Sequence, residues 1–157
     1  MQPEALLELA RHIVEHRSRR PSQVSLRRAL STTYYALFHA LAQNGADELV
    51  GKTASLRDSE AWLLAYRGIE HGRASSVFRN GSFMARFPPA IRKFGRFFVV
   101  MQTNRQLADY HPHKRFAKHF VLDCISDAER AIARFRAAKA ADRRTLSSRI
   151  LFRSRPL

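Results

Sequence analysis

The sequence has a single cysteine and no long apolar run, and each absence excludes a class of protein. Cys124 alone cannot build a disulfide framework within the chain or a cysteine-based zinc finger. The longest strongly apolar run, residues 97–101, is far shorter than the roughly 20 residues that span a membrane. The first residues place Glu4 and Glu8 among leucines, unlike the basic-then-apolar pattern of a signal peptide. We therefore expect a soluble cytoplasmic protein with no membrane partner.

Acidic residues are scarce as well. The 157 residues include 28 lysines and arginines against 13 aspartates and glutamates, which gives a formal net charge of +15. Arginine outnumbers lysine 23 to 5, and its planar fork suits phosphate oxygens. Such a basic domain attracts polyanions over a distance, which favours a nucleic acid as a partner. The simple alternative is that arginine-rich codon usage makes the protein basic without any such function.

The basic residues are concentrated in two stretches. Residues 71–108 contain no acidic residue, and residues 139–157 hold six basic residues against Asp142. Stretches of this kind are typical of phosphate-binding surfaces. We expect nucleic-acid contacts from both stretches and from one arginine upstream of them: Arg28, Arg73, Arg79, Arg86, Arg92, Lys93, Arg96, Arg143 and Arg144.

Apolar side chains recur at helical spacing, and no segment alternates with the period of a strand over strand length. This pattern predicts an all-α fold of four or five bundle helices joined by short connections. The first two expected helices are residues 3–17 and residues 21–45. A third starts at Asp58 or Ser59 and either ends near Gly68 and Gly72 or continues to Phe78. A fourth has an apolar stripe over residues 91–108 and ends before Pro112, and a fifth covers residues 113–140. Their expected core residues include Leu30, Tyr34, Leu37, Phe38, Trp62, Phe94, Phe98, Met101, Ile125 and Ile132.

The chain divides into an expected bundle, residues 1–140, and a basic C-terminal tail, residues 141–157. A polybasic tail is most often a solvated, mobile arm. Leu146 and Ile150 give this tail apolar anchors, so docking on a partner is the alternative.

Arg105 is the first candidate for a functional residue. Steps of three and four residues from Phe94 through Phe98 and Met101 arrive at Arg105, which places it on or beside the inward stripe of its helix. A guanidinium in that position needs a partner or a cleft. Asp109, four residues on, lies on the same face. The plain alternative to a functional arginine is therefore a structural Arg105–Asp109 pair.

His111 is the second candidate. It precedes Pro112, which disfavours the helical conformation for the residue before it, so His111 should leave the helix close to Arg105. An arginine and a histidine are the minimum set for RNA cleavage without a metal. The histidine moves a proton from the 2′-hydroxyl or to the leaving oxygen, and the arginine binds the phosphate and stabilises its developing charge. The alternative is that His111, His113 and His119 are simply surface residues of a basic loop.

Two further groups of residues, the paired tyrosines and the histidines, are candidates for binding sites. Tyr34 and Tyr35 follow Arg27 and Arg28, and aromatics interleaved with arginines can stack bases and bind phosphate. Tyr34 lies on the apolar stripe, so we expect only Tyr35 and Arg28 to face outward. The histidines lack the acidic cluster or second cysteine that would complete a zinc-like site, so we expect no metal and no cofactor.

Three segments together resemble one family. Residues 27–40 (Arg-Arg-Ala-Leu-Ser-Thr-Thr-Tyr-Tyr-Ala-Leu-Phe-His-Ala) resemble the second-helix signature of HEPN domains, the higher eukaryotes and prokaryotes nucleotide-binding family. Residues 105–110 (Arg-Gln-Leu-Ala-Asp-Tyr) resemble the Arg…Ala-Asp-Tyr element of one bacterial branch, and residues 71–78 begin with a histidine as is common there. The resemblance covers roughly residues 4–138. It implies an up-and-down bundle of four to five helices that commonly forms a dimer.

The resemblance also implies an activity. Many active members carry an arginine, four to six residues and then a histidine, and they act as metal-independent endoribonucleases; Arg105 and His111 match this spacing. They would be the catalytic residues at a homodimer cleft, with Asp109 and Tyr110 orienting them. Many bacterial members are the toxin of a toxin–antitoxin pair whose antitoxin is a minimal nucleotidyltransferase.

Two rival functions remain open. One is a non-catalytic HEPN module that binds a nucleotide or a nucleotidyltransferase partner. The other is a protein that coats RNA or DNA through charge alone.

Overall fold

The computed structural model describes residues 1–15 and 20–152, and in these ranges the chain is helical with no strand, so the expected all-α class is confirmed. Eight helices occur in this part of the chain where four or five were expected. They are α1 (Pro3–Glu15), α2 (Gln23–Leu49), α3 (Ser59–Arg67), α4 (His71–Arg79), α5 (Gly81–Met84), α6 (Pro89–Tyr110), α7 (Lys118–Ala137) and α8 (Ala140–Leu151). The end of the expected first helix, residues 16–17, lies outside the described residues.

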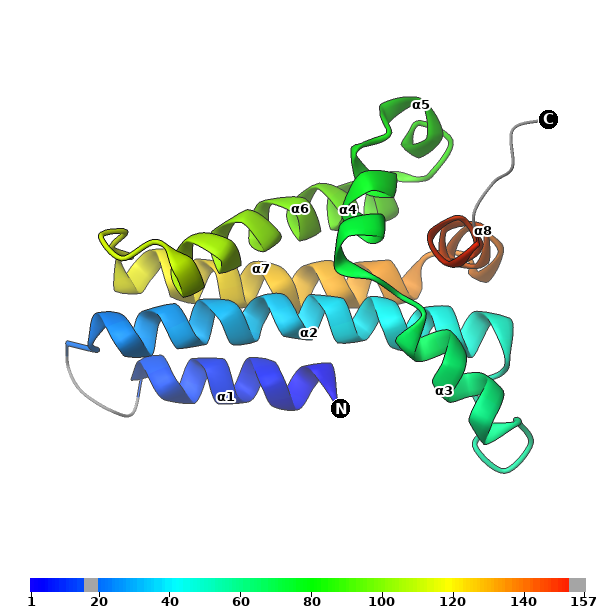
Figure 1. Ribbon diagram of the computed structural model, residues 1–157, viewed down its shortest axis with the longest axis horizontal. Helices are drawn as coiled ribbons and strands as arrows, with labels where there is room; N and C mark the ends of the chain where they lie inside the picture. The colour runs from blue at the N-terminus through cyan, green and yellow to red at the C-terminus, as the bar shows by residue number, and fades with distance from the viewer. Residues whose placement is uncertain (16–19, 153–157) are drawn as a thin grey trace.

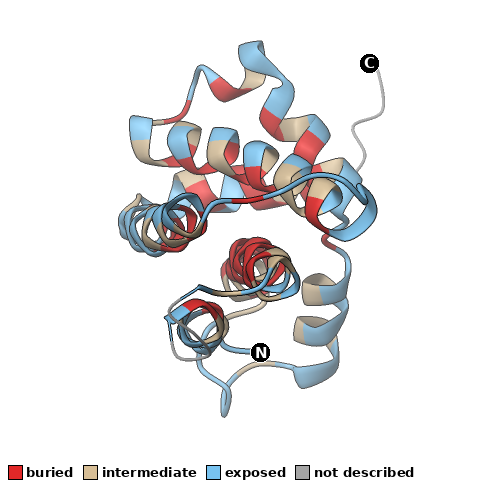
Figure 2. Ribbon diagram, turned by 90° about the vertical axis from the view of Figure 1, so that its left-hand side faces the viewer, coloured by how far each residue is buried: buried red, intermediate tan, exposed pale blue. Residues whose placement is uncertain are grey.

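Helix α2 is the centre of the molecule. It packs against α1, α3, α6, α7 and α8, and the long helices α1, α2, α6 and α7 run alongside one another (Figure 1). Seen almost end-on in Figure 2, α2 is buried around most of its circumference. A helix enclosed in this way carries small and apolar residues on nearly every face. The buried Ala29, Ala36 and Ala40 serve this purpose, because they let the neighbouring helices come close.

Local capping signals fix several helix starts. The side chains of Ser22, Asp58 and Asn80 accept hydrogen bonds from backbone N–H groups three residues later, at 3.1, 2.7 and 3.0 Å. Each satisfies one of the donors that a helix N-terminus leaves unpaired. At the other end of α6, His111 takes an extended conformation with φ −93° and ψ 108°, as expected for a residue before Pro112.

The expected stop of the second helix at Asn44 and Gly45 is wrong. Helix α2 continues to Leu49, because both residues are used in packing against other helices. Asn44 Nδ2 donates to Oγ of Ser147 on α8 at 3.0 Å, and Gly45 lies so close to Ile69 that a Cβ there would be 3.3 Å from its Cδ1. The residue in the left-handed region is Gly51, with φ +129°, two residues after the helix ends.

The last long helix begins at Lys118, later than the expected residue 113, because an arginine holds the preceding turn. Arg27 Nη1 donates to the carbonyl of Ala108 at 3.0 Å. Its Nη2 donates to the carbonyls of His111 at 2.8 Å and Pro112 at 3.1 Å, and also to that of Lys114. This one side chain satisfies carbonyls at the end of α6 and in the turn behind it.

Most of the expected core is buried. Leu30, Tyr34, Leu37, Phe94, Phe98, Met101, Ile125 and Ile132 are almost completely enclosed. Phe38 and Trp62 are only half-buried. Trp62 belongs to α3, which contains no fully buried residue and extends away from the bundle (Figure 1).

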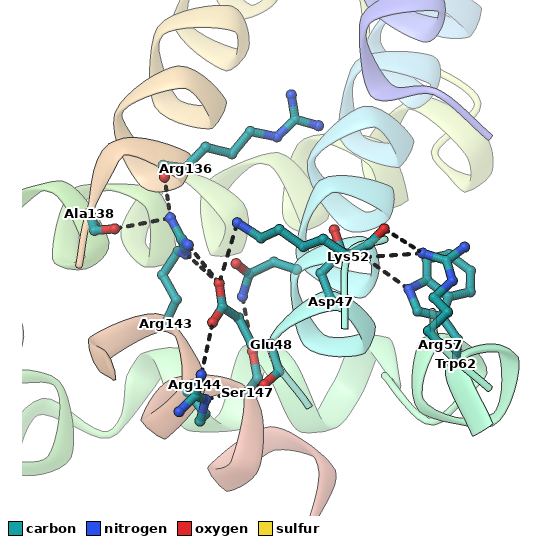
Figure 3. Close-up of polar contacts among 11 residues, drawn as sticks. Asp47, Glu48, Lys52, Arg57, Trp62, Arg136, Ala138, Arg143, Arg144 and Ser147 are labelled. Atoms are coloured by element: carbon teal, nitrogen blue, oxygen red, sulfur yellow. Dashed lines mark hydrogen bonds and ion pairs between the residues drawn. The ribbon is translucent and has the colours of Figure 1, made fainter. Parts of the chain in front are cut away.

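The segment expected as a basic tail forms α8 up to Leu151 and packs against α2 and α4. Its buried residues are Arg143, Leu146, Ser147 and Ile150, which recur on one face of the helix. Arg143 reaches the carboxylate of Glu48 on α2, as Figure 3 shows. The last basic residues of the expected tail, Arg153 and Arg155, lie outside the described residues.

Candidate functional site

Arg105 sits on α6 with its guanidinium held from two sides. Its Nε lies 2.7 Å from Oδ2 of Asp109 in an ion pair, and its Nη2 donates to the hydroxyl of Tyr35 on α2 at 3.0 Å. Its Cζ lies 5.6 Å from the ring centroids of both Tyr35 and Tyr110, within the range of a cation–π interaction. Ser31 Oγ donates to Oδ2 of Asp109 at 3.4 Å. The expected Arg105–Asp109 pair is therefore present, and it lies among aromatic rings.

The guanidinium remains charged in these surroundings. Partial burial acts to lower the pKa of Arg105, but Tyr35 and Asp109 outweigh it and raise the pKa. The side chain is 23% exposed, so the charge is also within reach of solvent. A positioned, partly accessible arginine of this kind suits a phosphate ligand.

His71, the first residue of α4, faces the same group of residues. Its Nδ1 lies 2.6 Å from the hydroxyl of Tyr34, and its ring stacks on Phe38 with 3.8 Å between centroids. Gln102 of α6 donates to the backbone carbonyl of His71 at 3.3 Å. Burial, the charge of Arg105 and the neighbouring His39 lower the pKa of His71, so its ring is neutral at pH 7. We call Tyr34, Tyr35, Phe38, His71, Arg105 and Asp109 the Arg105 cluster.

Further aromatic residues connect this cluster to α3. His39 Nδ1 is hydrogen-bonded to the hydroxyl of Tyr66, whose ring stacks on Trp62 at 5.1 Å. Burial lowers the pKa of His39 and raises the pKa of Tyr66, so both are neutral at pH 7. The line of rings gives the surface beside Arg105 the flat, polar-edged character that suits stacking of bases.

His111 is not part of this cluster within one chain. Its Nδ1 accepts a hydrogen bond from the backbone N–H of Lys114 at 3.1 Å, and its carbonyl accepts from Arg27. Among residues 1–15 and 20–152, no hydrogen bond, ion pair or ring contact joins His111 to Arg105. The other two expected site residues, Asp109 and Tyr110, do contact Arg105; Tyr110 is 73% exposed.

The arginines expected to bind nucleic acid differ in what they touch. Arg28, Arg79, Arg86, Lys93, Arg96 and Arg144 are exposed, and Arg73 and Arg92 are half-buried. Arg73 donates to the backbone carbonyls of Ile150, Arg149 and Phe152, and so caps the end of α8. Arg143 is 7% exposed and paired with Glu48, so an RNA phosphate cannot reach it. The expectation of RNA contact therefore does not hold for Arg143, whose partner lies 95 residues away in the sequence.

The described part of the chain also shows where its histidine, cysteine and acidic side chains lie. Residues 1–15 and 20–152 contain no group of three or more histidine, cysteine, aspartate and glutamate side chains that would hold a metal ion. Cys124 is buried, and its desolvation, together with the charges of Asp127 and Asp123, raises the pKa of the thiol to about 11. The thiol therefore stays protonated and is a poor nucleophile at neutral pH. None of the helices in these ranges is both long and apolar enough to cross a membrane.

Sequence reasoning did not select His71 as a site residue. The contact between Tyr34 and His71 joins two helices across 37 residues, and no local spacing encodes it. Tyr34 was assigned to the core from its place on the apolar stripe, and it is indeed 1% exposed. The Tyr34 hydroxyl nevertheless takes part in the Arg105 cluster, because a buried phenol needs a hydrogen-bond partner and finds it in His71.

Comparison of the chain with protein-family models, with curated proteins and with solved structures finds no match in any of the three.

Proposed function

We propose that this chain is a HEPN-like, RNA-binding, metal-independent endoribonuclease. In this proposal it acts in the cytoplasm as a homodimer and is the toxin of a toxin–antitoxin pair whose antitoxin is of the nucleotidyltransferase type. The observation that supports it best is the placement of Arg105: a charged, 23% exposed guanidinium held by Asp109 and Tyr35. It lies near the end of the stretch of residues 71–108, which contains no acidic residue, and the carboxylate that pairs with it, Asp109, directly follows that stretch.

The reaction would be an attack by the ribose 2′-hydroxyl on the adjacent phosphorus. The 2′-oxygen forms a bond to phosphorus, the bond to the 5′-oxygen breaks, and the products are a cyclic phosphate and a 5′-hydroxyl. Arg105 would bind the phosphate and stabilise its developing negative charge. A histidine would take the proton of the 2′-hydroxyl or supply one to the leaving oxygen. His111 is assigned this role, and a two-fold dimer would bring it to Arg105 of the other copy.

One observation favours a second function, a non-catalytic RNA-binding or nucleotide-binding module of the same family. The Nδ1 atom of His111 is already engaged by the backbone of Lys114, and the turn that carries it is fastened by Arg27. Because Nδ1 accepts this hydrogen bond, the neutral ring carries its hydrogen on Nε2 and cannot take the proton of the 2′-hydroxyl there. The module reading retains Arg105 as a phosphate ligand and needs no acid or base.

The two functions are separated by incubating the purified protein with total RNA in the presence of a chelator. Wild type should cleave, and His111→Ala should lose about 10²–10⁴-fold in rate, the usual contribution of a positioned acid or base. Arg105→Lys keeps the charge but removes the fork, and should also cleave more slowly. RNA that carries 2′-deoxyribose at the cleavage site should resist.

If wild type binds RNA but does not cleave it, or if His111→Ala cleaves as fast as wild type, the proposed catalytic role of His111 is wrong. In the first of these cases the module reading takes its place.

A further inference from the structure

The imidazole of His71 and the guanidinium of Arg105 are brought to one place by helices α2, α4 and α6. Both contact Tyr35: Arg105 donates to its hydroxyl at 3.0 Å, and the His71 ring meets its ring edge-on with 6.1 Å between centroids. Gln102, one turn before Arg105 on α6, donates to the backbone carbonyl of His71. The charge of Arg105 therefore acts directly on the His71 ring, whose pKa it lowers.

Arg105 has one nitrogen left for a ligand. Its Nε faces Asp109 and its Nη2 is used by Tyr35. Within residues 1–15 and 20–152, no hydrogen bond or ion pair engages Nη1. Arg143 differs, because Glu48 and the carbonyls of Arg136 and Ala138 engage all three of its nitrogens. Arg105 is thus positioned by two partners and still able to bind an anion through Nη1.

His71 likewise has one ring nitrogen left. Burial raises the pKa of Tyr34, so the phenol keeps its proton and can donate it to Nδ1 of His71 at 2.6 Å. A neutral imidazole that accepts at Nδ1 carries its hydrogen on Nε2. No hydrogen bond within the described residues engages Nε2. Although one face of the ring is covered by Phe38, His71 as a residue is exposed, so we assign Nε2–H as a donor for a ligand.

The groups around His71 favour an anion. The charged or titratable residues that face it are Tyr34, Tyr35 and His39 on α2 and Arg105 on α6, with Asp109 paired to Arg105. Glu70 precedes His71 in the chain and is exposed. Burial lowers the pKa of the unliganded imidazole, and the guanidinium of Arg105 lowers it further. A bound anion would offset that charge and favour the protonated ring, which is the stronger hydrogen-bond donor.

We propose that Arg105 and His71 together bind one phosphodiester group of RNA, with Arg105 Nη1 and His71 Nε2 as the donors and Tyr34 as the residue that fixes the imidazole. The inference rests on the proposed function in that the ligand is RNA, but it does not require that RNA be cleaved. The ring of Tyr35, between the two donors in the hydrogen-bonded cluster, lies where a neighbouring base can stack.

The test uses the full-length protein, an eight-nucleotide oligouridylate and inorganic phosphate as probes. His71→Phe keeps a ring to stack on Phe38 but removes both nitrogens, and His119→Phe makes the same change at an exposed histidine of α7. We expect His71→Phe to lose about tenfold in affinity for the oligouridylate, as for a hydrogen bond to a charged group. His119→Phe should stay within about twofold, a factor too small for the loss of such a bond.

A second readout, the pKa of His71, is measured first in the wild-type protein, so that this part of the test does not depend on how a variant folds. The imidazole C–H resonance of His71 in the wild-type protein gives its pKa by NMR titration. We expect this pKa to rise when the oligouridylate is added. It should also rise without ligand in Arg105→Gln, because the nearby positive charge is gone.

The outcomes separate the inference from the proposed function. If the oligouridylate binds and Arg105→Gln weakens it, while His71→Phe binds like wild type and the His71 pKa does not move, the shared phosphate site is wrong and RNA binding stands. If inorganic phosphate moves the His71 pKa as strongly as the oligouridylate at equal phosphate concentration, the ligand is a free phosphate and the RNA assignment is overturned. If wild type does not bind the oligouridylate, both proposals fail.

Discussion

Two arginines packed beside α2 show how differently the same side chain is used at the end and in the middle of one helix. Near the end of α2, Arg143 is 7% exposed, and its three nitrogens all have partners in Glu48 and the carbonyls of Ala138 and Arg136 (Figure 3). In the middle of α2, Arg105 is 23% exposed and keeps one nitrogen without a partner in the described residues. The first arginine holds helices together, and the second is the one for which we propose a phosphate ligand.

The contrast shows that the charge of an arginine does not by itself tell whether the side chain stabilises the fold or is available to a ligand. A buried ion pair is held by geometry and desolvation, and removing one member leaves an uncompensated charge in the interior. A half-exposed pair is screened by solvent and contributes little to stability. Substitutions at the two places should therefore separate stability from RNA binding.

The largest effect is expected from Glu48→Ala. Loss of this carboxylate leaves Arg143 buried without its counter-ion, which should lower the free energy of unfolding by about 3–5 kcal/mol. Urea denaturation followed by circular dichroism measures it. The matched control is Lys52→Ala: its ammonium lies 4.0 Å from the same carboxylate but the side chain is 66% exposed, so the loss should be about 0–1 kcal/mol. Equal losses in the two variants would remove the distinction between buried and exposed partners.

The next effect concerns the hydrogen bond beside that pair. Asn44→Ala removes the donor to Ser147 Oγ, which lies 3.0 Å away and is buried. Leaving that hydroxyl unsatisfied should cost about 1–3 kcal/mol. A double-mutant cycle with Ser147→Ala isolates the pair, because the second substitution should then cost less than it does in wild type. Strict additivity would mean that the two side chains do not interact.

Arg105→Gln, unlike Glu48→Ala, should weaken RNA binding more than it lowers stability. Because the Arg105–Asp109 pair is partly solvated, we expect the free energy of unfolding to fall by no more than about 1 kcal/mol. RNA affinity should nevertheless fall, and with a weaker dependence on salt, since one phosphate contact is lost. Unfolding curves and binding isotherms at two salt concentrations test both halves. A large loss of stability with unchanged RNA binding would place Arg105 with Arg143 as a structural residue.

The smallest effect concerns pH. Burial lowers the native pKa of His39, and burial together with Arg105 lowers that of His71, below the unfolded value of about 6.5. Between the native values and about pH 6.5 the unfolded state therefore binds more protons. Stability is complete above this window and falls as pH is lowered through it. His71→Phe with His39→Phe should flatten the dependence between pH 7 and 5. An unchanged slope would show that other groups cause it.

The sequence predicts those features that depend on local chemistry. Apolar spacing and the capping side chains of Ser22 and Asp58 locate most of the helices, and Pro112 correctly ends α6. Helix α5, which Asn80 caps, was not expected. The stop expected at Gly45 fails because its missing side chain serves close packing against Ile69 instead of a turn.

The features that the sequence does not reveal arise from contacts between distant segments. Arg143 was expected on a solvated arm, and nothing near it in the chain indicates Glu48 as its partner. The Arg105–Asp109 pair was accessible to prediction because four residues separate its members on one helix. The arrival of His71 beside Tyr34 depends on how α4 crosses α2, which no short-range pattern specifies.

Helix α4 connects the Arg105 cluster to the end of α8. One turn of this helix presents His71 to Tyr34 and Arg105, and two residues later Arg73 grips the carbonyls at the end of α8. Undocking of α8 would release that grip and loosen the turn that carries His71. If a ligand at the Arg105 cluster binds more tightly when α8 is docked, α8 docks more firmly when that ligand is bound, by the same free energy.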